Sequence, residues 1–311
     1  MIESRSRTAW LPHLVLVLGV VVFAFPIYMA LVGSTHDAGT IGRGGLPLSP
    51  GGLAADNYAQ AWTQGSGMRV KAPPVSRMLL NSLVMAVVIA VGKIAVSVIS
   101  AYAVVFFQFP GRMFFFWMIF VTLMLPVEVR IIPTFKVVSD LGLINTFPGL
   151  TVPLIASATA TLLFRQFFMT IPDNLVEAAK IDGAGPLRFF KDILIPLSRT
   201  NIAALFVILF IFGWNQYLWP LLITTSRSMD TIVIGITKMI GTGDAQTDWN
   251  LIMATAVLAM LPPVGVVMLM QRWFVKGLVE TEKRSSSCWR GWPSASSPPW
   301  RARCWRSRRR G

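Results

Sequence analysis

Six long apolar stretches constrain the fold of this 311-residue chain more than any other feature. Each has about 20 or more mainly apolar residues, the length that a helix needs to cross the hydrocarbon core of a bilayer. A segment in lipid must satisfy its own backbone hydrogen bonds, so we expect an all-α integral membrane protein with six transmembrane helices. The predicted spans are residues 11–33, 78–106, 113–135, 149–170, 200–223 and 251–274.

The composition argues against a soluble protein. Hydrophobic residues make up 54% of the chain and charged residues only 14%, whereas a typical soluble domain has about 25% charged residues. Too few polar residues remain to cover a soluble core. Residues 1–283 contain no cysteine, so this part has neither a disulfide framework nor a cysteine-based metal site.

The net charge of +14 is concentrated at the C-terminal end. Residues 284–311 contain eight arginines and no acid, which leaves +6 for the rest of the chain. This segment has no apolar periodicity, so we expect an unstructured basic tail and no nucleic-acid partner. Two interpretations remain open: a basic tail at the membrane surface, or an out-of-frame extension.

The lysines and arginines between the spans predict the orientation. With the N-terminus inside, the inner segments hold 11 basic residues in 63 positions, against 8 in 90 for the outer segments. Positive residues favour the cytoplasmic side, so residues 1–10 form a cytoplasmic N-tail and both termini lie in the cytoplasm. The loop 34–77 is rich in glycine and proline and is expected to form an irregular cap outside.

The loop between the fourth and fifth spans, residues 171–199, is too polar to cross a membrane. Its pattern predicts two short helices. Pro172 lies where the first helix begins, and Asn174 with Glu177 fits a capping box. The loop is therefore expected to form a helical elbow beside the membrane.

Two glycines and a proline divide this elbow. Gly183 and Gly185 are expected to end the first helix, and Pro186 to open the second. The elbow also carries apolar residues that we expect on a surface facing the cytoplasm, and such a patch is typical of a docking site. These residues are Ala178, Ala179, Phe189 and Phe190.

The same loop contains a spaced pattern. Glu-Ala-Ala at 177–179 is followed by Gly183, Ile193, Ile195 and Pro196. This spacing resembles the EAA signature of the permease subunits of binding-protein-dependent ABC importers, in which Leu stands where this chain has Ile195. The resemblance covers residues 8–283. Segments 123–135, 157–173 and 213–222 are most similar to glycerol-phosphate permeases of the carbohydrate-uptake branch.

The resemblance implies a transmembrane domain over residues 11–283 and a coupling helix at 173–182 that docks in a groove of a cytoplasmic ATPase. Glu177 would face a basic residue of that ATPase. From the residues alone, Glu177 has a second interpretation as a purely structural capping carboxylate. The residues that the resemblance assigns to ATPase coupling are Glu177, Ala178, Ala179, Asp182, Gly183 and Pro196.

The resemblance also implies the partners: a second permease subunit in a heterodimer, two copies of the ATPase, and an external solute-binding protein, all at the bacterial inner membrane. ATP and Mg²⁺ would bind the ATPase, leaving this chain without cofactor or metal and not itself an enzyme. In agreement, the Gly92-Lys93 pair does not belong to a phosphate-binding GxxxxGK[ST] loop. Val87 stands where this motif needs glycine, and Ile94 stands where it needs serine or threonine.

The implied substrate is sn-glycerol-3-phosphate or a glycerophosphodiester, moved by alternating access. A neutral sugar or polyol is the alternative within the family. A secondary transporter would need paired broken helices in an internal repeat, which the sequence does not show. A scaffold without transport would leave the ionisable groups in the spans unexplained.

Polar side chains at membrane depth are the candidates for the substrate pathway. An ionisable residue near the centre of a span costs about 2.5–3.5 kcal/mol on insertion scales. Pro126 and Pro133 lie on either side of Glu128 and Arg130 and predict a helix break there. Irregular backbone of this kind is tolerated at membrane depth where it lines a cavity. Structural alternatives remain: a snorkelling lysine, a Glu–Arg pair and an interfacial aromatic belt. The candidates are Lys93, Glu128, Arg130, Trp214, Asn215, Gln216 and Tyr217.

Overall fold

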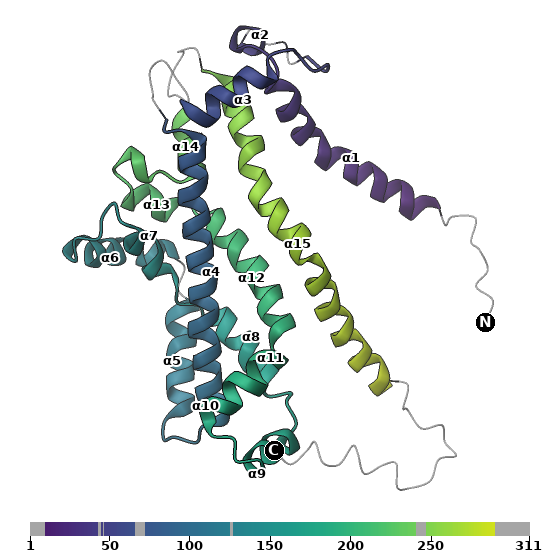
Figure 1. Ribbon diagram of the computed structural model, residues 1–311, viewed down its shortest axis with the longest axis vertical. Helices are drawn as coiled ribbons and strands as arrows, with labels where there is room; N and C mark the ends of the chain where they lie inside the picture. Colours follow the sequence, from purple (N-terminus) through teal and green to yellow (C-terminus); the bar gives the residue numbers. More distant parts are fainter. Residues whose placement is uncertain are drawn as a thin grey trace.

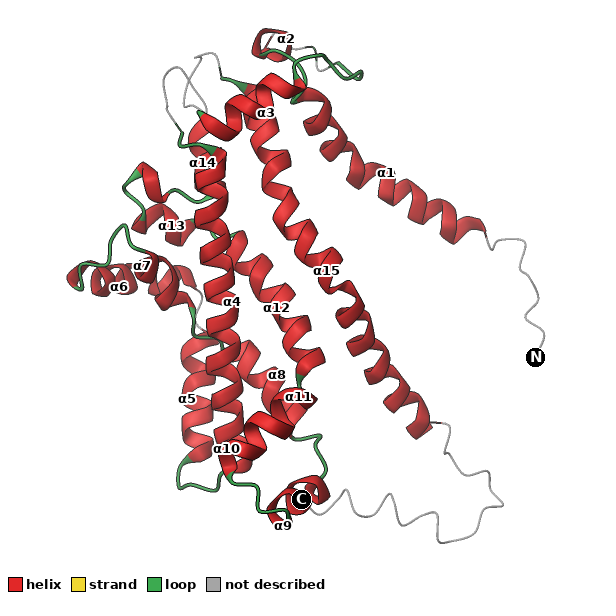
Figure 2. Cartoon of the chain, in the orientation of Figure 1, coloured by secondary structure: helices red, strands yellow, loops and turns green. Residues whose placement is uncertain are grey.

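The computed structural model describes residues 10–42, 45, 47–65, 72–124, 127–240 and 247–289, without the side chains of 122–124, 127–128 and 272–289. Within these ranges all regular secondary structure is helical (Figure 2). The predicted all-α class is therefore confirmed for the described part of the chain.

Three described helices are long and apolar enough to cross a membrane. They are α1 (Trp10–Gly33), α4 (Val75–Phe106) and the apolar part, Trp249–Gln271, of α15 (Trp249–Trp289). Two bent pairs raise the number to as many as five. The helix α5 (Arg112–Met124) is apolar but shorter, so the count of six spans stays a prediction.

The first bent pair lies on the fourth predicted span, whereas the second combines part of the predicted loop 171–199 with the fifth predicted span. The first joins Phe147–Leu154, which comprises α7 (Phe147–Thr151) and η1 (Val152–Leu154), to α8 (Ala158–Phe168) with a bend of 50°. The second joins Pro186–Leu197 to α12 (Arg199–Trp214) with a bend of 70°.

The helix α4 lies at the centre of the bundle and packs against both α8 and α12 (Figure 1). It begins after Pro74, whose ring fixes an extended entry at φ −52° and ψ 140°. Its buried residues recur at spacings of three and four, which is the pattern of a helix with one packed face. They include Met78, Ser82, Met85, Ala86, Ile89, Lys93, Ser97 and Ala101.

Small residues let α4 approach its neighbours closely. A Cβ atom at Gly213 of α12 would lie 2.9 Å from Cα of Ala86. A Cβ atom at Gly92 would lie 2.8 Å from the side chain of Ile155, next to η1. Helices in membranes associate through such close van der Waals packing, so these two contacts fix the positions of α12 and η1 on α4.

A smaller apolar cluster holds α6 (Val127–Asp140), α7 and α13 (Leu218–Ile223) against α4. In Figure 1 these helices lie on the side of α4 away from α15. Trp219 is the largest buried side chain of the cluster, and its Nε1 donates to the carbonyl oxygen of Gly149 at 3.1 Å. The cluster contains Met85, Ile89, Val138, Leu150, Leu154, Trp219 and Ile223.

The loop 34–77 is less irregular than expected. It contains two helices, α2 (Ala38–Gly42) and α3 (Ala54–Thr63). The reason is a buried amide: Asn57 Nδ2 donates to the carbonyl oxygens of Ser34 and His36 at 2.9 and 2.8 Å. Asn250 Nδ2 in turn donates to Asn57 Oδ1 at 2.9 Å and ties the cap to α15.

A buried carboxylate orders the segment around η3 (Arg227–Met229) and α14 (Ile232–Met239). Asp230 is fully buried and accepts a bond from Lys238 Nζ at 2.8 Å. Asn81 Nδ2 of α4 donates to the carbonyl oxygen of Asp230 at 3.0 Å. Burial raises the pKa of the Asp230 carboxyl, and the Lys238 ammonium acts in the opposite direction.

The first and last long helices are attached differently. Only 6% of the apolar window of α1 is buried, and its buried residues, Val32 and Gly33, lie at its C-terminal end. There Gly33 contacts Met253 of α15. Figure 1 shows the rest of α1 extending away from the bundle. The helix α15 packs along α12 and continues past Lys283 to Trp289. The start of the segment 284–311, predicted to be unstructured, is therefore helical, and residues 290–311 lie outside the described part.

Candidate functional site: the elbow and the lysine site

The elbow lies at the end of the bundle opposite α2 and α3 (Figure 1). Its segments are α9 (Asp173–Ile181), α10 (Pro186–Arg188), the π-helical η2 (Phe189–Leu194) and α11 (Ile195–Leu197). The coupling helix expected at 173–182 therefore corresponds to α9, which ends one residue earlier.

The first turn of α9 differs from the predicted capping box. Pro172 takes the N-cap position in extended conformation, at φ −65° and ψ 139°, without a side-chain cap. The helix begins at Asp173, so Asn174 lies inside it and the N-cap prediction for Asn174 is wrong. The reason is that Pro172 already sets the helix start, while the Asp173 carboxylate in the first turn complements the helix dipole.

The end of α9 agrees with the prediction. Gly183 has a φ of 71°, a conformation that favours glycine. The N–H groups of Gly183 and Ala184 donate to the carbonyl oxygens of Lys180 and Ala179 at 3.0 and 2.9 Å, which is the Schellman arrangement. Pro186 then opens α10, as expected.

The elbow is anchored to the end of α4 by aromatic packing. The Phe189 and Phe106 ring centroids lie 5.4 Å apart, and Tyr102 Oη donates to the carbonyl oxygen of Pro186 at 2.9 Å. These contacts bury part of the patch expected at the surface, because the rings of α4 offer it a packed environment. The residues that point inward instead are Ala179, Phe189 and, in part, Phe190.

The outward side of the elbow carries a different apolar pair, one residue from α9 and one from α10. Ile181 and Leu187 are 86% and 83% exposed, and they flank the turn at Gly183. Glu177 and Ala178 are exposed on the same helix, as is Asp182 at its C-cap. The sequence reasoning missed Ile181, although it follows Glu177 by four residues and so shares its face.

A sharp bend joins the elbow to α12. Pro196 lies in α11, and Ser198 is buried with its Oγ donating to the carbonyl oxygen of Leu194 at 2.6 Å. Proline removes a backbone donor, and π-helical turns are frequent at functional sites. The chain therefore changes direction by 70° just before α12 begins.

Lys93 lies near the middle of α4, and its residue is only 6% exposed. Its Nζ is 3.8 Å from the centroid of the Phe212 ring on α12, a cation–π contact. Ion pairs among the described side chains join Arg188 to Asp192 and Lys238 to Asp230, so Lys93 has no acidic partner among them. Phe212 did not stand out in the sequence.

Arg130 lies on α6, which does not break at Pro133 as predicted. The helix α5 ends at Met124 and α6 begins at Val127, but α6 continues through Pro133. One helix therefore carries Arg130 and Pro133, with Thr134 Oγ1 donating to the carbonyl oxygen of Arg130 at 2.7 Å. The side chain of Glu128 and residue Pro126 lie outside the described part.

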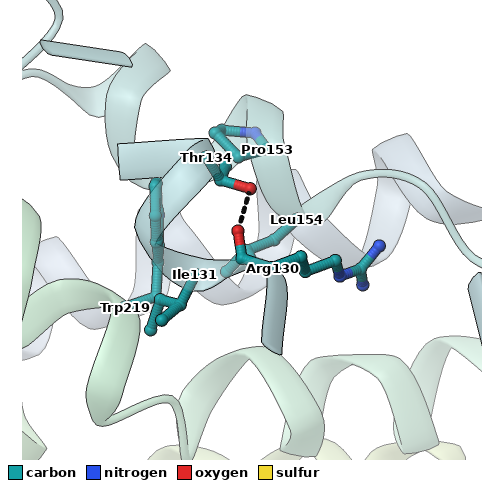
Figure 3. Close-up of a pocket in the computed structure, with 6 residues that line it drawn as sticks. All are labelled: Arg130, Ile131, Thr134, Pro153, Leu154 and Trp219. Carbon is teal, nitrogen blue, oxygen red and sulfur yellow. Dashed lines mark hydrogen bonds between the residues drawn. The ribbon is translucent and has the colours of Figure 1, made fainter. Parts of the chain in front are cut away.

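A small pocket adjoins Arg130 (Figure 3). Its lining residues are Arg130, Ile131, Thr134, Pro153, Leu154 and Trp219. In Figure 3 the Arg130 guanidinium points away from Trp219. Arg130 lines this pocket together with Leu154, and the next residue, Ile155, contacts Gly92 of α4, so α4 and α6 bring Lys93 and Arg130 into one region. We call Lys93, Phe212 and Arg130 the lysine site.

The aromatic and amide residues at 214–217, predicted as one set, lie in different environments. Trp214 is buried in the main core and stacks on Phe210 with centroids 5.8 Å apart. Asn215 and Tyr217 are exposed, and Gln216 Nε2 donates to the carbonyl oxygen of Phe212 at 3.1 Å. These last three residues form the link between α12 and α13, so the fifth predicted span is interrupted here.

Comparison with known proteins identifies the family of this chain. Residues 93–280 match the family described as binding-protein-dependent transport system inner membrane component. The chain is 61% identical to the sn-glycerol-3-phosphate transport system permease protein UgpE of Rhizobium meliloti, over 283 residues that cover 91% of this chain and 100% of that protein. With the same coverage, the UgpE proteins of Brucella melitensis and Yersinia pestis are 60% and 56% identical.

A solved structure shares the fold. A crystal structure of a bacterial ABC transporter involved in the import of the acidic polysaccharide alginate matches with a TM-score of 0.73 and 21% identity, covering 88% of this chain and 99% of that chain. The family match covers more than half of the sequence, and the similarity to the UgpE proteins extends over their whole length. The chain therefore belongs to the inner membrane components, or permease subunits, of binding-protein-dependent transport systems.

Proposed function

We propose that this chain is the permease subunit of an ATP-driven importer of sn-glycerol-3-phosphate and glycerophosphodiesters. The names of the relatives support the substrate. The exposed face of the elbow carries the rest of the proposal, because an anchored helix with unpartnered apolar side chains is suited to receive force from another protein.

The elbow is the docking site of the ATPase. Ile181 and Leu187 supply apolar contacts, and Glu177 and Ala178 complete the face that α9 presents. Glu177 pairs with a basic group of the ATPase. Asp182 and Gly183 form the turn that exposes this face, and Pro196 lies at the bend toward α12.

The assembly contains a second permease subunit, two copies of the ATPase and an external solute-binding protein. The ATPase subunits bind ATP and Mg²⁺ and hydrolyse ATP, while this chain contributes the path. It lies in the inner membrane with both termini in the cytoplasm, an orientation supported by the excess of basic residues in the inner segments.

Force from the ATPase reaches the path through a continuous set of contacts. The elbow is packed on Phe106 and Tyr102 of α4 and is joined by the bend at Ser198 to α12. The same α12 carries Phe212 against Lys93. A movement of α9 therefore shifts α12 relative to the lysine site, and alternating access follows from two arrangements of these helices.

The substrate pathway passes the lysine site and the link after α12. Lys93 and Arg130 supply positive charge, and Glu128 lies on α6 at the mouth of the path. Asn215, Gln216 and Tyr217 offer hydrogen bonds to hydroxyl groups from irregular backbone, the kind that is tolerated at membrane depth when it lines a cavity. Trp214 forms part of the packed wall behind them.

The test uses the four-component transporter in proteoliposomes. Glu177→Lys places a positive charge on the docking face, so ATP-driven uptake of labelled glycerol phosphate should fall at least about a hundredfold while the protein stays in the membrane. Asp140→Lys, an exposed charge reversal at the end of α6, is the matched control and should keep uptake near the wild-type rate.

Three results would contradict the proposal. Normal uptake by Glu177→Lys would remove the docking role of α9. Uptake by this chain without any ATPase would indicate a secondary transporter. Uptake of maltose but not of glycerol phosphate by the wild-type transporter would assign a neutral sugar as substrate.

A further inference from the structure

Lys93 is a buried cation without a described counter-charge. The residue is only 6% exposed, and the described acids that form ion pairs, Asp192 and Asp230, pair with other residues. An unpaired charge inside a membrane protein is costly, and such residues mark pathways for ions and substrates. The Phe212 ring compensates only part of this cost, because a cation–π contact is weaker than a buried ion pair.

A second cation makes the site more favourable for an anion. Arg130 lies in the same region, on the pocket that Leu154 and its neighbour Ile155 join to Gly92 of α4, and like charges raise the cost of keeping both in a low-dielectric region. An anion that enters between them removes this cost and gains charge-assisted hydrogen bonds. A phosphomonoester carries about −1.5 to −2 charges near neutral pH, which matches two cations better than the single charge of a phosphodiester does.

We propose that Lys93 binds the phosphoryl group of a phosphomonoester in the transport path, with Arg130 as the second cation and Phe212 as the residue that positions the Lys93 ammonium. This inference rests on the proposed function and names the part of the substrate that this site selects. Phe212 acts through Lys93: its ring holds the ammonium at mid-depth while no substrate is bound.

The position of Phe212 links binding to movement. It lies two residues before the end of α12, on the helix that the bend joins to the elbow. Gly213, the next residue, contacts Ala86 of α4 and fixes the distance between the two helices. A displacement of α12 therefore changes the contact between Phe212 and Lys93, and with it the hold on the phosphoryl group.

The experiment compares two esters in one transporter. The reconstituted complex receives a binding protein saturated with either labelled sn-glycerol-3-phosphate or labelled glycerophosphocholine, at equal concentrations of loaded binding protein. The readout is the ratio of monoester to diester import. The binding protein is the same for every variant, so a change in this ratio belongs to the permease and not to general damage.

Lys93→Met should lower the ratio about tenfold to a hundredfold, as expected for the loss of charge-assisted bonds to a dianion. Lys93→Arg keeps the charge and should restore most of it. Phe212→Leu should lower the ratio several-fold, and Phe212→Tyr, which keeps the ring, should rescue it. Phe206→Leu on the same helix is the matched control and should leave the ratio unchanged, because Phe206 packs on Phe210.

The outcomes separate this inference from the proposed function. A wild-type complex that imports neither ester contradicts the proposed function. If the wild-type complex imports both esters and Lys93→Met leaves the ratio of monoester to diester import unchanged, the inference alone is overturned. This holds whether or not the import rates of the two esters fall. Co-purification with the ATPase shows whether each variant assembles. If Lys93→Met does not assemble, the test is the import ratio of Phe212→Leu, and an unchanged ratio for that variant overturns the inference.

Discussion

The elbow and the lysine site differ in how they are built. The elbow comes from one continuous segment, residues 171–198, whose inner face packs on α4 and whose outer face exposes Ile181 and Leu187. The lysine site draws Lys93, Phe212 and Arg130 from three helices that are far apart in the sequence, and its central charge is buried. The elbow exposes apolar side chains, whereas the lysine site encloses a charge.

This contrast indicates which substitutions should disturb the elbow and which should disturb the lysine site. The proposed docking face depends on the packing behind it, which holds the elbow on α4. A buried charge depends on the distance between helices, which small residues such as Gly213 set. The following four predictions test this contrast through stability and transport.

The largest effect is expected at the elbow anchor. Phe189→Ala removes a buried ring from the contact with Phe106, and such truncations cost about 3–5 kcal/mol. The midpoint of thermal unfolding should fall clearly, and uptake should fall with it. Phe115→Ala, which removes an exposed ring from α5, is the control. An unchanged midpoint for Phe189→Ala would show that the elbow is not anchored through this ring.

The second effect concerns the helix contact beside the lysine site. Gly213→Leu places side-chain atoms where a Cβ alone would lie 2.9 Å from Cα of Ala86, and overpacking of this kind costs about 1–3 kcal/mol. Thermal unfolding should shift less than for Phe189→Ala, while uptake should be lost because α12 moves from α4. Gly265→Leu, where a Cβ meets nothing within 4 Å, should be tolerated. Equal uptake by both variants would contradict the prediction.

A third effect tests the turn that presents the docking face. Gly183 has a positive φ, so Gly183→Val should cost about 1–2 kcal/mol locally and weaken binding of the ATPase. Gly183→Asn should be close to wild type, because asparagine tolerates this conformation. Co-purification of the ATPase measures the difference. Failure of both variants to the same degree would mean that the glycine is required for space, although a Cβ there meets nothing within 4 Å.

The smallest effect on stability is expected at the surface itself. Ile181→Asp changes a side chain that is 86% exposed, so the unfolding midpoint should move by an amount equivalent to about 0.5 kcal/mol or less. Binding of the ATPase should nevertheless fall strongly, because a charge replaces an apolar contact. Val137→Asp on α6 changes a side chain that is 57% exposed and should affect neither property. Intact binding by Ile181→Asp would place the docking face elsewhere.

Local sequence patterns predicted the elbow well. The start at Pro172, the turn at Gly183 and the opening of α10 at Pro186 all depend on a few neighbouring residues, and the structure confirms them. Its two faces were assigned incorrectly, because burial of Ala179 and Phe189 depends on rings of α4 that lie more than 60 residues away. Capping at Asn174 failed for a local reason, since Pro172 had already set the helix start.

The lysine site was only partly predictable. Lys93 and Arg130 stood out because charged residues are rare in apolar stretches. Phe212 did not, because one more phenylalanine in an apolar helix carries no signal until α12 is placed on α4. The ends of the helices within the spans were predicted incorrectly for the same reason. The end of α12 at Trp214 and the continuation of α6 through Pro133 depend on neighbouring helices.

The loose attachment of α1 has a consequence for how the chain is assembled. A helix that keeps only its last turn against its neighbours gains little from them, so its stability in the bilayer comes from its own backbone bonds and its contact with lipid tails. Such a segment can insert before the bundle closes, and its removal would leave the α4–α8–α12 packing intact. Biogenesis of this protein can therefore proceed in two stages, with α1 as an independent tether and the bundle as the later, cooperative unit.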